Sequence, residues 1–206
     1  LRLIGEGGMA RVYEAEQLVP RRRVALKFLR REAATERSLG RFRTEMEILA
    51  RLQHPGIASV YEAVIDADEP YIVMELVQGI PLDDYADVRQ LDLQARIELY
   101  AAVCDAVAFA HSQGVVHRDL KPANILVETT PSGTHVSASG RPGARPKILD
   151  FGIARVLDDD SVRGHTLTRT GELVGTPAYM SPEQTMMDPS KVGKAADVYA
   201  LGVIGY

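Results

Sequence analysis

Four side chains in the middle of the chain have the types and the spacing that chemistry on phosphate groups requires. In the run His-Arg-Asp-Leu-Lys-Pro-Ala-Asn at 117–124, Asp119, Lys121 and Asn124 fall within six positions, and Asp150 follows the strand-like run at 147–149. A carboxylate can orient a hydroxyl group and accept its proton, a lysine can neutralise phosphate charge, and an amide oxygen can coordinate Mg²⁺. The alternative, a plain polar turn stiffened by proline, leaves the Asp-Phe-Gly run at 150–152 without explanation.

A glycine-rich run, Gly-Glu-Gly-Gly-Met-Ala, occupies residues 5–10 near the N-terminus. Glycine allows backbone N–H groups to approach a phosphate closely because it has no Cβ. A dinucleotide-binding turn has a similar pattern, but it requires a helix to begin immediately after the glycines. Here a strand-like run, Arg-Val-Tyr-Glu-Ala-Glu, follows at 11–16. The pattern therefore favours a glycine-rich flap between two strands.

Lys27 lies inside the apolar run Val-Ala-Leu-Lys-Phe-Leu at 24–29. A lysine on an edge strand, with its stem packed and its ammonium group in water, is one interpretation. A functional buried lysine is the other, and it requires a carboxylate partner because an unpaired buried charge is costly. Glu45, on the helix that we expect next, is the candidate partner.

Hydrophobic periodicity predicts a β-rich first part of the chain. A hairpin is expected from the runs at 12–16 and 24–29, and further strands at 57–64 and 71–77. Apolar residues at helical spacing predict a helix between Arg37 and Leu52.

The longest helix is predicted at 92–113, with Gly114 at its C-terminal cap. We expect its buried face to consist of Ile97, Tyr100, Ala101, Cys104, Val107, Ala108 and His111. A β-rich lobe followed by a helical lobe is an α+β organisation. The Ser-, Thr-, Gly- and Pro-rich segment 129–146 is expected to be a loop insertion.

Composition narrows the class of protein. The 206 residues include 24 Lys and Arg against 28 Asp and Glu, a formal charge of −4. This balance disfavours a nucleic-acid-binding protein, and no apolar run has the length of a membrane span. The single cysteine, Cys104, fits a reducing, cytoplasmic environment. The last residues stop inside an apolar run without a helix stop signal, so we expect a fragment truncated at its C-terminus.

Taken in order, these motifs resemble those of the eukaryotic-type (Hanks-type) serine/threonine protein kinases. The resemblance covers the glycine-rich run, the strand of Lys27, the helix of Glu45, the His-Arg-Asp and Asp-Phe-Gly motifs, and the Ser-Pro-Glu motif at 181–183. The sequence Met-Ser-Pro-Glu-Gln at 180–184 suggests a bacterial member of this kinase family. The resemblance implies a partial kinase domain over 1–206, with a bilobal fold. Its β-rich N-lobe with one main helix would be 1–77, and its incomplete helical C-lobe 78–206.

The resemblance implies that ATP and Mg²⁺ bind to this domain. Lys27 would hold the α- and β-phosphates and pair with Glu45, and Asn124 and Asp150 would hold Mg²⁺. Val12, Ala25 and Leu126 would enclose the adenine. The complete set implied for ATP comprises Ile4, Gly5, Gly7, Gly8, Val12, Ala25, Lys27, Met74, Glu75, Val77, Leu126 and Asp150.

Catalytic roles are implied in the same way. Asp119 would orient the substrate hydroxyl and take its proton late, since a free aspartate is too weak a base at neutral pH. Lys121 would neutralise the migrating γ-phosphate. Together with Asn124, Lys27 and Glu45, these residues form the implied catalytic set. The resemblance also implies that Asp197 is the buried aspartate that holds the backbone of the catalytic loop.

The resemblance also implies protein substrates and regulation through the chain's own activation segment. Thr176 would bridge Asp119 and Lys121. A phosphate on Thr168 or Thr170 could dock on Arg118, because a phosphothreonine adds about −1.5 to −2 of charge. The alternative is that these threonines simply suit a solvated loop. Autophosphorylation would make the chain its own partner, with a dimer left open.

Two alternative functions remain. A pseudokinase or nucleotide-binding scaffold usually lacks the lysine or one of the two aspartates, but Lys27, Asp119 and Asp150 are all present. A small-molecule phosphotransferase is disfavoured by Lys121 and by the Gly-Thr-Pro-Ala-Tyr run at 175–179. We expect no nucleic-acid partner, and no membrane contact within the fragment, although the parent protein could be tethered by another segment.

Overall fold

A computed structural model of the chain describes residues 1–7, 10–29, 46–65, 69–129, 144–151, 177–185 and 192–206. The predictions for Gly8, Glu45, Thr168, Thr170 and Thr176 lie outside the described residues. The chain divides into two compact units. The first includes the described parts of Leu1–Gln53 and Ser59–Leu76, and the second includes His54–Ala58, Val77–Phe151 and Ala178–Tyr206. The β-rich and mainly helical parts agree with the predicted α+β class.

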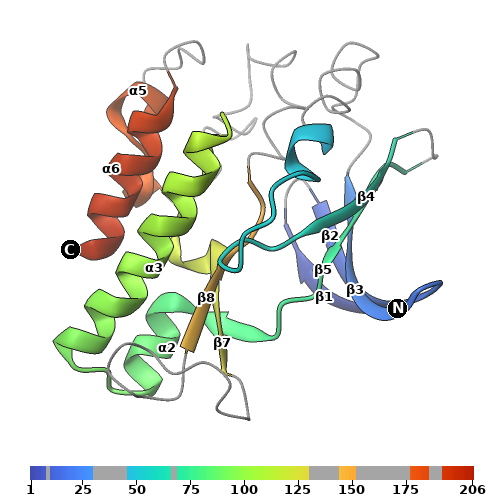
Figure 1. Ribbon diagram of the computed structural model, residues 1–206, viewed down its shortest axis with the longest axis horizontal. Helices are drawn as coiled ribbons and strands as arrows, with labels where there is room; N and C mark the ends of the chain where they lie inside the picture. Colours follow the sequence, from blue (N-terminus) through green and yellow to red (C-terminus); the bar gives the residue numbers. More distant parts are fainter. Residues whose placement is uncertain (8–9, 30–45, 66–68, 130–143, 152–176, 186–191) are drawn as a thin grey trace, which may run out of the picture. The chain divides into compact units, whose positions relative to one another are not determined.

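The first unit contains a five-stranded antiparallel sheet with strand order β1-β2-β3-β5-β4 (Figure 1). The strands are β1 (Arg2–Glu6), β2 (Ala10–Leu18), β3 (Arg21–Leu29), β4 (Val60–Val64) and β5 (Tyr71–Glu75). β3 lies at the centre and pairs with β2 and β5. An aromatic row follows one face of the sheet, where Phe28 contacts Tyr13 and Tyr71 at centroid distances of 5.7 and 5.5 Å.

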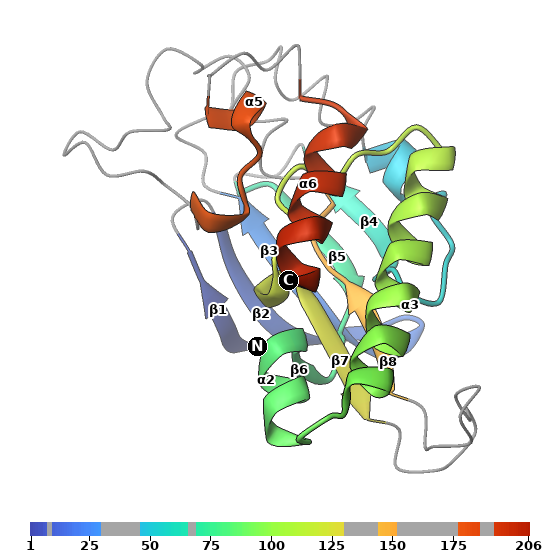
Figure 2. The same cartoon turned by 90° about the vertical axis from the view of Figure 1, so that its left-hand side faces the viewer.

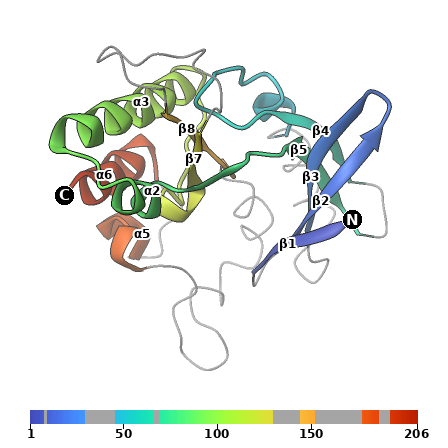
Figure 3. The same cartoon turned by 90° about the horizontal axis from the view of Figure 1, so that it is seen from below.

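The second unit combines a small sheet with helices. Its elements are β6 (Gly79–Pro81), α2 (Leu82–Val88), α3 (Leu93–Ser112), η2 (Pro122–Asn124), β7 (Ile125–Thr129), β8 (Ala144–Ile148), α5 (Pro182–Thr185) and α6 (Lys194–Gly205). A short helix, η3 (Pro177–Tyr179), precedes α5. The strands pair in the order β6-β7-β8, and α3 packs against β8 and α6 (Figure 2). α2 packs beside β7 and η2 (Figure 3).

Helix α3 has the ends that its sequence predicts. The Asp92 carboxylate caps its N-terminus by accepting the N–H of Ala95 at 2.9 Å. After the C-terminus, Gly114 has a φ of 81°, and the N–H of Val115 donates to the Ala110 carbonyl at 2.9 Å. A glycine in this left-handed conformation is the usual way to end a helix. The predicted cap is therefore confirmed.

The predicted buried face of α3 is wrong at several positions. The side chains that the helix buries are Leu99, Val103, Ala106, Val107 and Ala110. Ile97 is 51% exposed, and Ala101 and Ala108 are also exposed, whereas Tyr100, Cys104 and His111 are half-buried. Apolar residues occur all around this helix, so periodicity alone could not select the face that packs against β8 and α6.

The strand boundaries also differ from those expected. β4 begins at Val60 because Ile57 bridges Ile148 and the N–H of Ala58 donates to the Ile148 carbonyl at 2.9 Å, which ties this segment to the second unit. β5 ends at Glu75. β7 continues to Thr129 and β8 begins at Ala144, so both ends of the expected insertion belong to strands. Among the described residues, no helix is long and apolar enough to cross a membrane.

Candidate active site

The loop at 117–121 is held by a buried carboxylate on α6. Asp197 is 1% exposed, and its Oδ2 and Oδ1 accept the backbone N–H groups of His117 at 2.8 Å and Arg118 at 2.7 Å. Oδ2 also accepts from Nε2 of His111, on α3, at 2.8 Å. Three donors compensate for the burial of this charge. The sequence resemblance predicts this buried aspartate, and the contacts confirm it.

The His117 side chain reinforces the loop from inside. Its Nε2 lies 2.8 Å from the Leu149 carbonyl oxygen, and its Nδ1 accepts the N–H of Asp119 at 3.2 Å. A carbonyl only accepts and an amide N–H only donates, so the imidazole is neutral with its hydrogen on Nε2. Burial lowers the pKa of His117, which agrees with that state. The ring also packs on Phe151 at a centroid distance of 4.8 Å.

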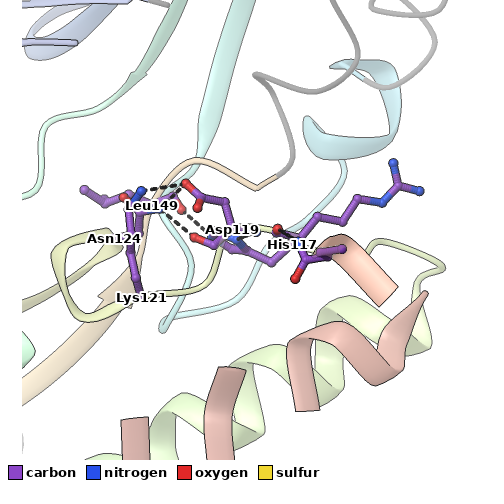
Figure 4. Close-up of polar contacts among 7 residues, drawn as sticks. His117, Asp119, Lys121, Asn124 and Leu149 are labelled. Carbon is purple, nitrogen blue, oxygen red and sulfur yellow. Dashed lines mark hydrogen bonds and ion pairs between the residues drawn. The ribbon is translucent and has the colours of Figure 1, made fainter. Parts of the chain in front are cut away.

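Asp119, Lys121 and Asn124 converge as the sequence predicts (Figure 4). Lys121 Nζ donates to Asp119 Oδ2 at 2.8 Å, and Asn124 Nδ2 donates to the same oxygen at 3.2 Å and to the Asp119 carbonyl at 2.8 Å. Among the described residues, the hydrogen bonds of this carboxylate all fall on Oδ2. The side chain of Asp119 is 58% exposed, so Oδ1 can receive a group from solvent.

Asn124 and Asp150 carry oxygen atoms of the kind that binds a hard cation. The N–H of Leu149 donates to the Asn124 carbonyl at 2.8 Å, which brings the segment that carries Asp150 to η2. Because Nδ2 of Asn124 is committed to Asp119, the amide oxygen is the atom left to coordinate. In the part of the chain that is described, no group of three or more His, Cys, Asp or Glu side chains could hold a metal. Mg²⁺ typically binds to one or two protein oxygens, and phosphate oxygens and water complete its coordination.

Two residues of this site adopt a left-handed backbone conformation. Arg118 has a φ of 67° and Asp150 has a φ of 56°. Such angles are uncommon outside glycine and persist where the surroundings enforce them. For Arg118, those surroundings include the carboxylate of Asp197 and the side chain of Gln184.

Gln184, on α5, contacts the loop of Asp119, and the sequence did not predict this contact. Its Nε2 donates to the Arg118 carbonyl at 2.6 Å. The available signal was the Ser-Pro-Glu-Gln run at 181–184, which has the form of a helix capping box. That pattern predicts the start of a helix but not a contact 66 positions away.

In the first unit, four predicted ATP-binding residues share one face of the sheet. Val12 pairs with Lys27 across β2 and β3, and Ala25 pairs with Met74 across β3 and β5. Directly paired residues, and residues two apart on one strand, have their side chains on the same face. Gly5 pairs with Val12 and so joins this set from β1.

Lys27 is a buried lysine on the central strand. It is 7% exposed, and β3 pairs on both sides, which excludes the exposed edge-strand interpretation. Its predicted partner, Glu45, lies outside the described residues.

The remaining predicted ATP-binding residues lie at strand ends and on β7. Ile4 is on β1, and the N–H of Gly7 donates to the Ala10 carbonyl at 2.9 Å, closing the start of the glycine-rich turn. Glu75 exchanges backbone and side-chain hydrogen bonds with Ser59, since its N–H donates to the Ser59 carbonyl and its Oε2 accepts the Ser59 N–H. Val77 is buried, and Leu126 on β7 is half-buried.

The guanidinium group of Arg118 is available for an anion. Its Nε is buried and has no hydrogen-bond partner among the residues that the structure describes. A buried donor without a partner is costly, so an incoming acceptor would be favoured there.

Comparisons with known proteins agree over the full chain. The family model for the protein kinase domain matches residues 1–206. The chain is 39% identical to serine/threonine-protein kinase PknB of Mycobacterium tuberculosis over 210 aligned residues. This alignment covers 99% of the chain and 31% of the mycobacterial protein. PknB of Mycobacterium leprae gives the same identity and coverage. Serine/threonine-protein kinase PknA of M. tuberculosis is 40% identical over 212 residues, or 100% of the chain and 44% of that protein. The chain thus spans less than half the length of these relatives.

Proposed function

Because this chain belongs to the protein kinase family, we propose that it transfers the γ-phosphate of ATP to Ser and Thr hydroxyl groups of proteins. The observation that carries the proposal is the cluster of Asp119, Lys121 and Asn124 on a loop whose backbone is fixed by Asp197. Phosphoryl transfer passes through a loose transition state, so positioning and charge neutralisation supply most of the catalysis.

Asp119 is proposed to receive the substrate hydroxyl at Oδ1. Its Oδ2 is occupied by Lys121 and Asn124, which fixes the plane of the carboxylate and leaves the other oxygen to orient the incoming oxygen nucleophile. The hydroxyl proton passes to Asp119 late, when the oxygen–phosphorus bond has largely formed. Lys121, 2.8 Å from Asp119, neutralises charge on the phosphoryl group that moves.

The nucleotide is proposed to bind to the residues that the motifs implied for ATP. Lys27 pairs with the α- and β-phosphates and with Glu45, while Gly5, Gly7 and Gly8 offer backbone N–H groups to phosphate oxygens. The adenine contacts Ile4, Val12, Ala25 and Leu126, and hydrogen-bonds to the backbone of Glu75 and Val77, next to Met74. Lys27 sharing a sheet face with Val12, Ala25 and Met74 supports this assignment.

Mg²⁺ is proposed to bind to Asn124 and Asp150. When bound, the ion neutralises phosphate charge and orients the phosphate oxygens. The commitment of Asn124 Nδ2 to Asp119 supports this role, because it directs the amide oxygen to the cation.

Regulation through the activation segment forms part of the proposal. A phosphate on Thr168 or Thr170 accepts hydrogen bonds from Arg118, whose Nε lacks a partner among the described residues. Thr176 is proposed to bridge Asp119 and Lys121 as part of this regulation. Transfer from one copy of the chain to another supplies the phosphate, so the chain is among its own substrates. The domain acts in the cytoplasm, where ATP is available and Cys104 stays reduced.

The test uses the whole protein that contains this domain, treated with a phosphatase and then incubated with Mg·ATP and a peptide library containing Ser, Thr and Tyr. Mass spectrometry identifies the residues that gain phosphate. The proposal predicts phosphate on Ser and Thr peptides and none on Tyr peptides. If the protein binds ATP but transfers no phosphate, the kinase proposal is contradicted and a nucleotide-binding scaffold is favoured.

A further inference from the structure

The side-chain amide of Gln184 connects two segments of the second unit. Its Oε1 accepts the N–H of Ser181 at 3.0 Å and the Ser181 hydroxyl at 3.2 Å, and the first of these bonds is the glutamine half of a capping box at the start of α5. Its Nε2 donates to the Arg118 carbonyl at 2.6 Å. Gln184 is only 7% exposed, so water cannot readily replace these bonds. Reversing the amide would set Nε2 against an N–H and Oε1 against a carbonyl, and the contacts thus determine its orientation.

The peptide group between Arg118 and Asp119 is held on both sides. Its carbonyl accepts from Gln184, and its N–H, that of Asp119, donates to Nδ1 of His117 at 3.2 Å. The preceding N–H, that of Arg118, donates to Asp197. Arg118 has a φ of 67°, a conformation that must be enforced. A change in the ψ angle of Arg118 alone would turn both this peptide and the bond from Cα to Cβ of Asp119, and with it the carboxylate.

We propose that Gln184 is a positioning residue for Asp119, acting through the carbonyl of Arg118. This inference rests on the proposed kinase function and extends it to a second support for the catalytic loop, from α5, beside the Asp197 support from α6. Gln184 touches neither nucleotide nor hydroxyl substrate in this role. Its loss therefore impairs the transfer step rather than ATP binding.

Substitutions at position 184 can distinguish the two roles of this side chain, which are the cap of α5 and the hydrogen bond to the Arg118 carbonyl. A glutamate at 184 keeps an oxygen for the Ser181 N–H and serves equally well in a capping box. As a carboxylate, however, it has no hydrogen to donate, and it sets an oxygen against the Arg118 carbonyl. When protonated, its O–H can donate to that carbonyl again. Methionine at the same position has a similar length and makes neither bond.

The experiment compares Gln184→Glu, Gln184→Met and the control Thr185→Val in the whole protein, with Mg·ATP and a Ser/Thr substrate peptide. Thr185 lies next on α5 and is exposed, and within the described part of the chain its hydroxyl bonds only to the Pro182 carbonyl of the same helix. We expect both Gln184 variants to lower kcat by about tenfold to a hundredfold at neutral pH, as misplaced catalytic groups do. The KM for ATP should change by less than about twofold, and Thr185→Val should match the wild type.

The pH profile gives a readout that a purely structural role would not. Relative to the wild type at each pH, the kcat of Gln184→Glu should rise as pH falls and its carboxyl becomes protonated, whereas that of Gln184→Met should not. A folded Gln184→Met with wild-type kcat would overturn the inference. So would a kcat of Gln184→Glu that keeps a constant ratio to the wild type across the pH range.

Hydrogen exchange keeps the two proposals distinguishable. The Asp119 amide should exchange faster in Gln184→Glu than in the wild type, while amides of α3 keep their protection. If the wild type transfers no phosphate, the proposed kinase function fails. The exchange rate of the Asp119 amide still shows in that case whether Gln184 positions Asp119. Unchanged exchange at Asp119 in a folded variant contradicts the inference. If Gln184→Met does not fold, Gln184→Glu provides both readouts.

Discussion

The backbone N–H of Asp119 donates to Nδ1 of His117 at 3.2 Å, so the residue proposed for catalysis is tied to a titratable ring. The opposite nitrogen, Nε2, donates to the Leu149 carbonyl at 2.8 Å. Both bonds exist together only in the neutral ring. Protonation of Nδ1 would remove the acceptor for Asp119 and place a charge in a fully buried position.

Stability should therefore decline on mild acidification. Burial lowers the pKa of His117 in the folded chain below the ordinary value of 6.5, so the unfolded chain binds more protons in this range. The contribution of His117 to stability is complete above pH 6.5 and is lost as the pH falls from 6.5 toward the lowered pKa. The loss is at most about 1.4 kcal/mol per pH unit. Urea unfolding of the wild type and His117→Asn at several pH values measures it.

The variant lacks the titrating ring, so its free energy of unfolding should depend less steeply on pH over this range. The other four histidines of the chain are present in both proteins, so the comparison isolates His117. Parallel slopes for the wild type and His117→Asn would show that His117 does not couple to folding in this way.

Asp197 should be the most costly polar side chain in the second unit to remove. Asp197→Ala leaves the N–H groups of His117 and Arg118 and Nε2 of His111 without their shared acceptor. Breaking a buried, hydrogen-bonded charge costs about 3–5 kcal/mol. Asp197→Asn should cost less, because its one oxygen still accepts from Arg118. Chemical denaturation gives the values, and Asp105→Asn, at an exposed position on α3, serves as the control.

Lys27 is expected to act on ATP rather than on the fold. Lys27→Met fills the same space on β3 and removes the ammonium group. Phosphoryl transfer should fall by at least about a hundredfold, the scale for removing one electrostatic contact to a reacting group. Lys147→Met, at a buried lysine on β8, controls for the loss of a buried lysine and should have a far smaller effect. Equal losses in the two variants would argue against a specific role for Lys27.

Arg118 should couple activity to phosphorylation of the activation segment. In the wild type, prior incubation with Mg·ATP should raise the initial rate on a peptide above that of phosphatase-treated protein. Arg118→Met should abolish that increase, because the phosphate loses its partner. Thr168→Ala combined with Thr170→Ala should give the same result. An increase that persists in Arg118→Met would remove this arginine from the regulatory proposal.

Local pattern was sufficient to predict the centre of the site. Asp119, Lys121 and Asn124 are close in sequence, and one loop with a short helix brings them together whatever surrounds it. Lys27 and its neighbours on one sheet face follow from strand alternation and hairpin pairing. Asp197 is 80 positions from His117, and only the resemblance to a known family indicated that contact.

Other features depend on packing that a sequence does not state. The buried face of α3 depends on where β8 and α6 lie, since apolar residues occur on all sides of the helix. Ile57 belongs with β8 rather than β4 because its backbone bridges Ile148. Gln184 looks like an ordinary helix-start residue until its amide meets the carbonyl of Arg118. Each of these is a contact between distant segments.

The most direct test of phosphoryl transfer through Asp119 compares the phosphatase-treated wild type with Asp119→Asn, both in the whole protein. Each is given Mg·ATP and a Ser/Thr peptide, and nucleotide binding is measured by calorimetry while phosphate gained is measured by mass spectrometry. The account predicts similar ATP affinity for the two proteins and phosphate on the peptide with the wild type only. Transfer by Asp119→Asn at the wild-type rate would contradict it.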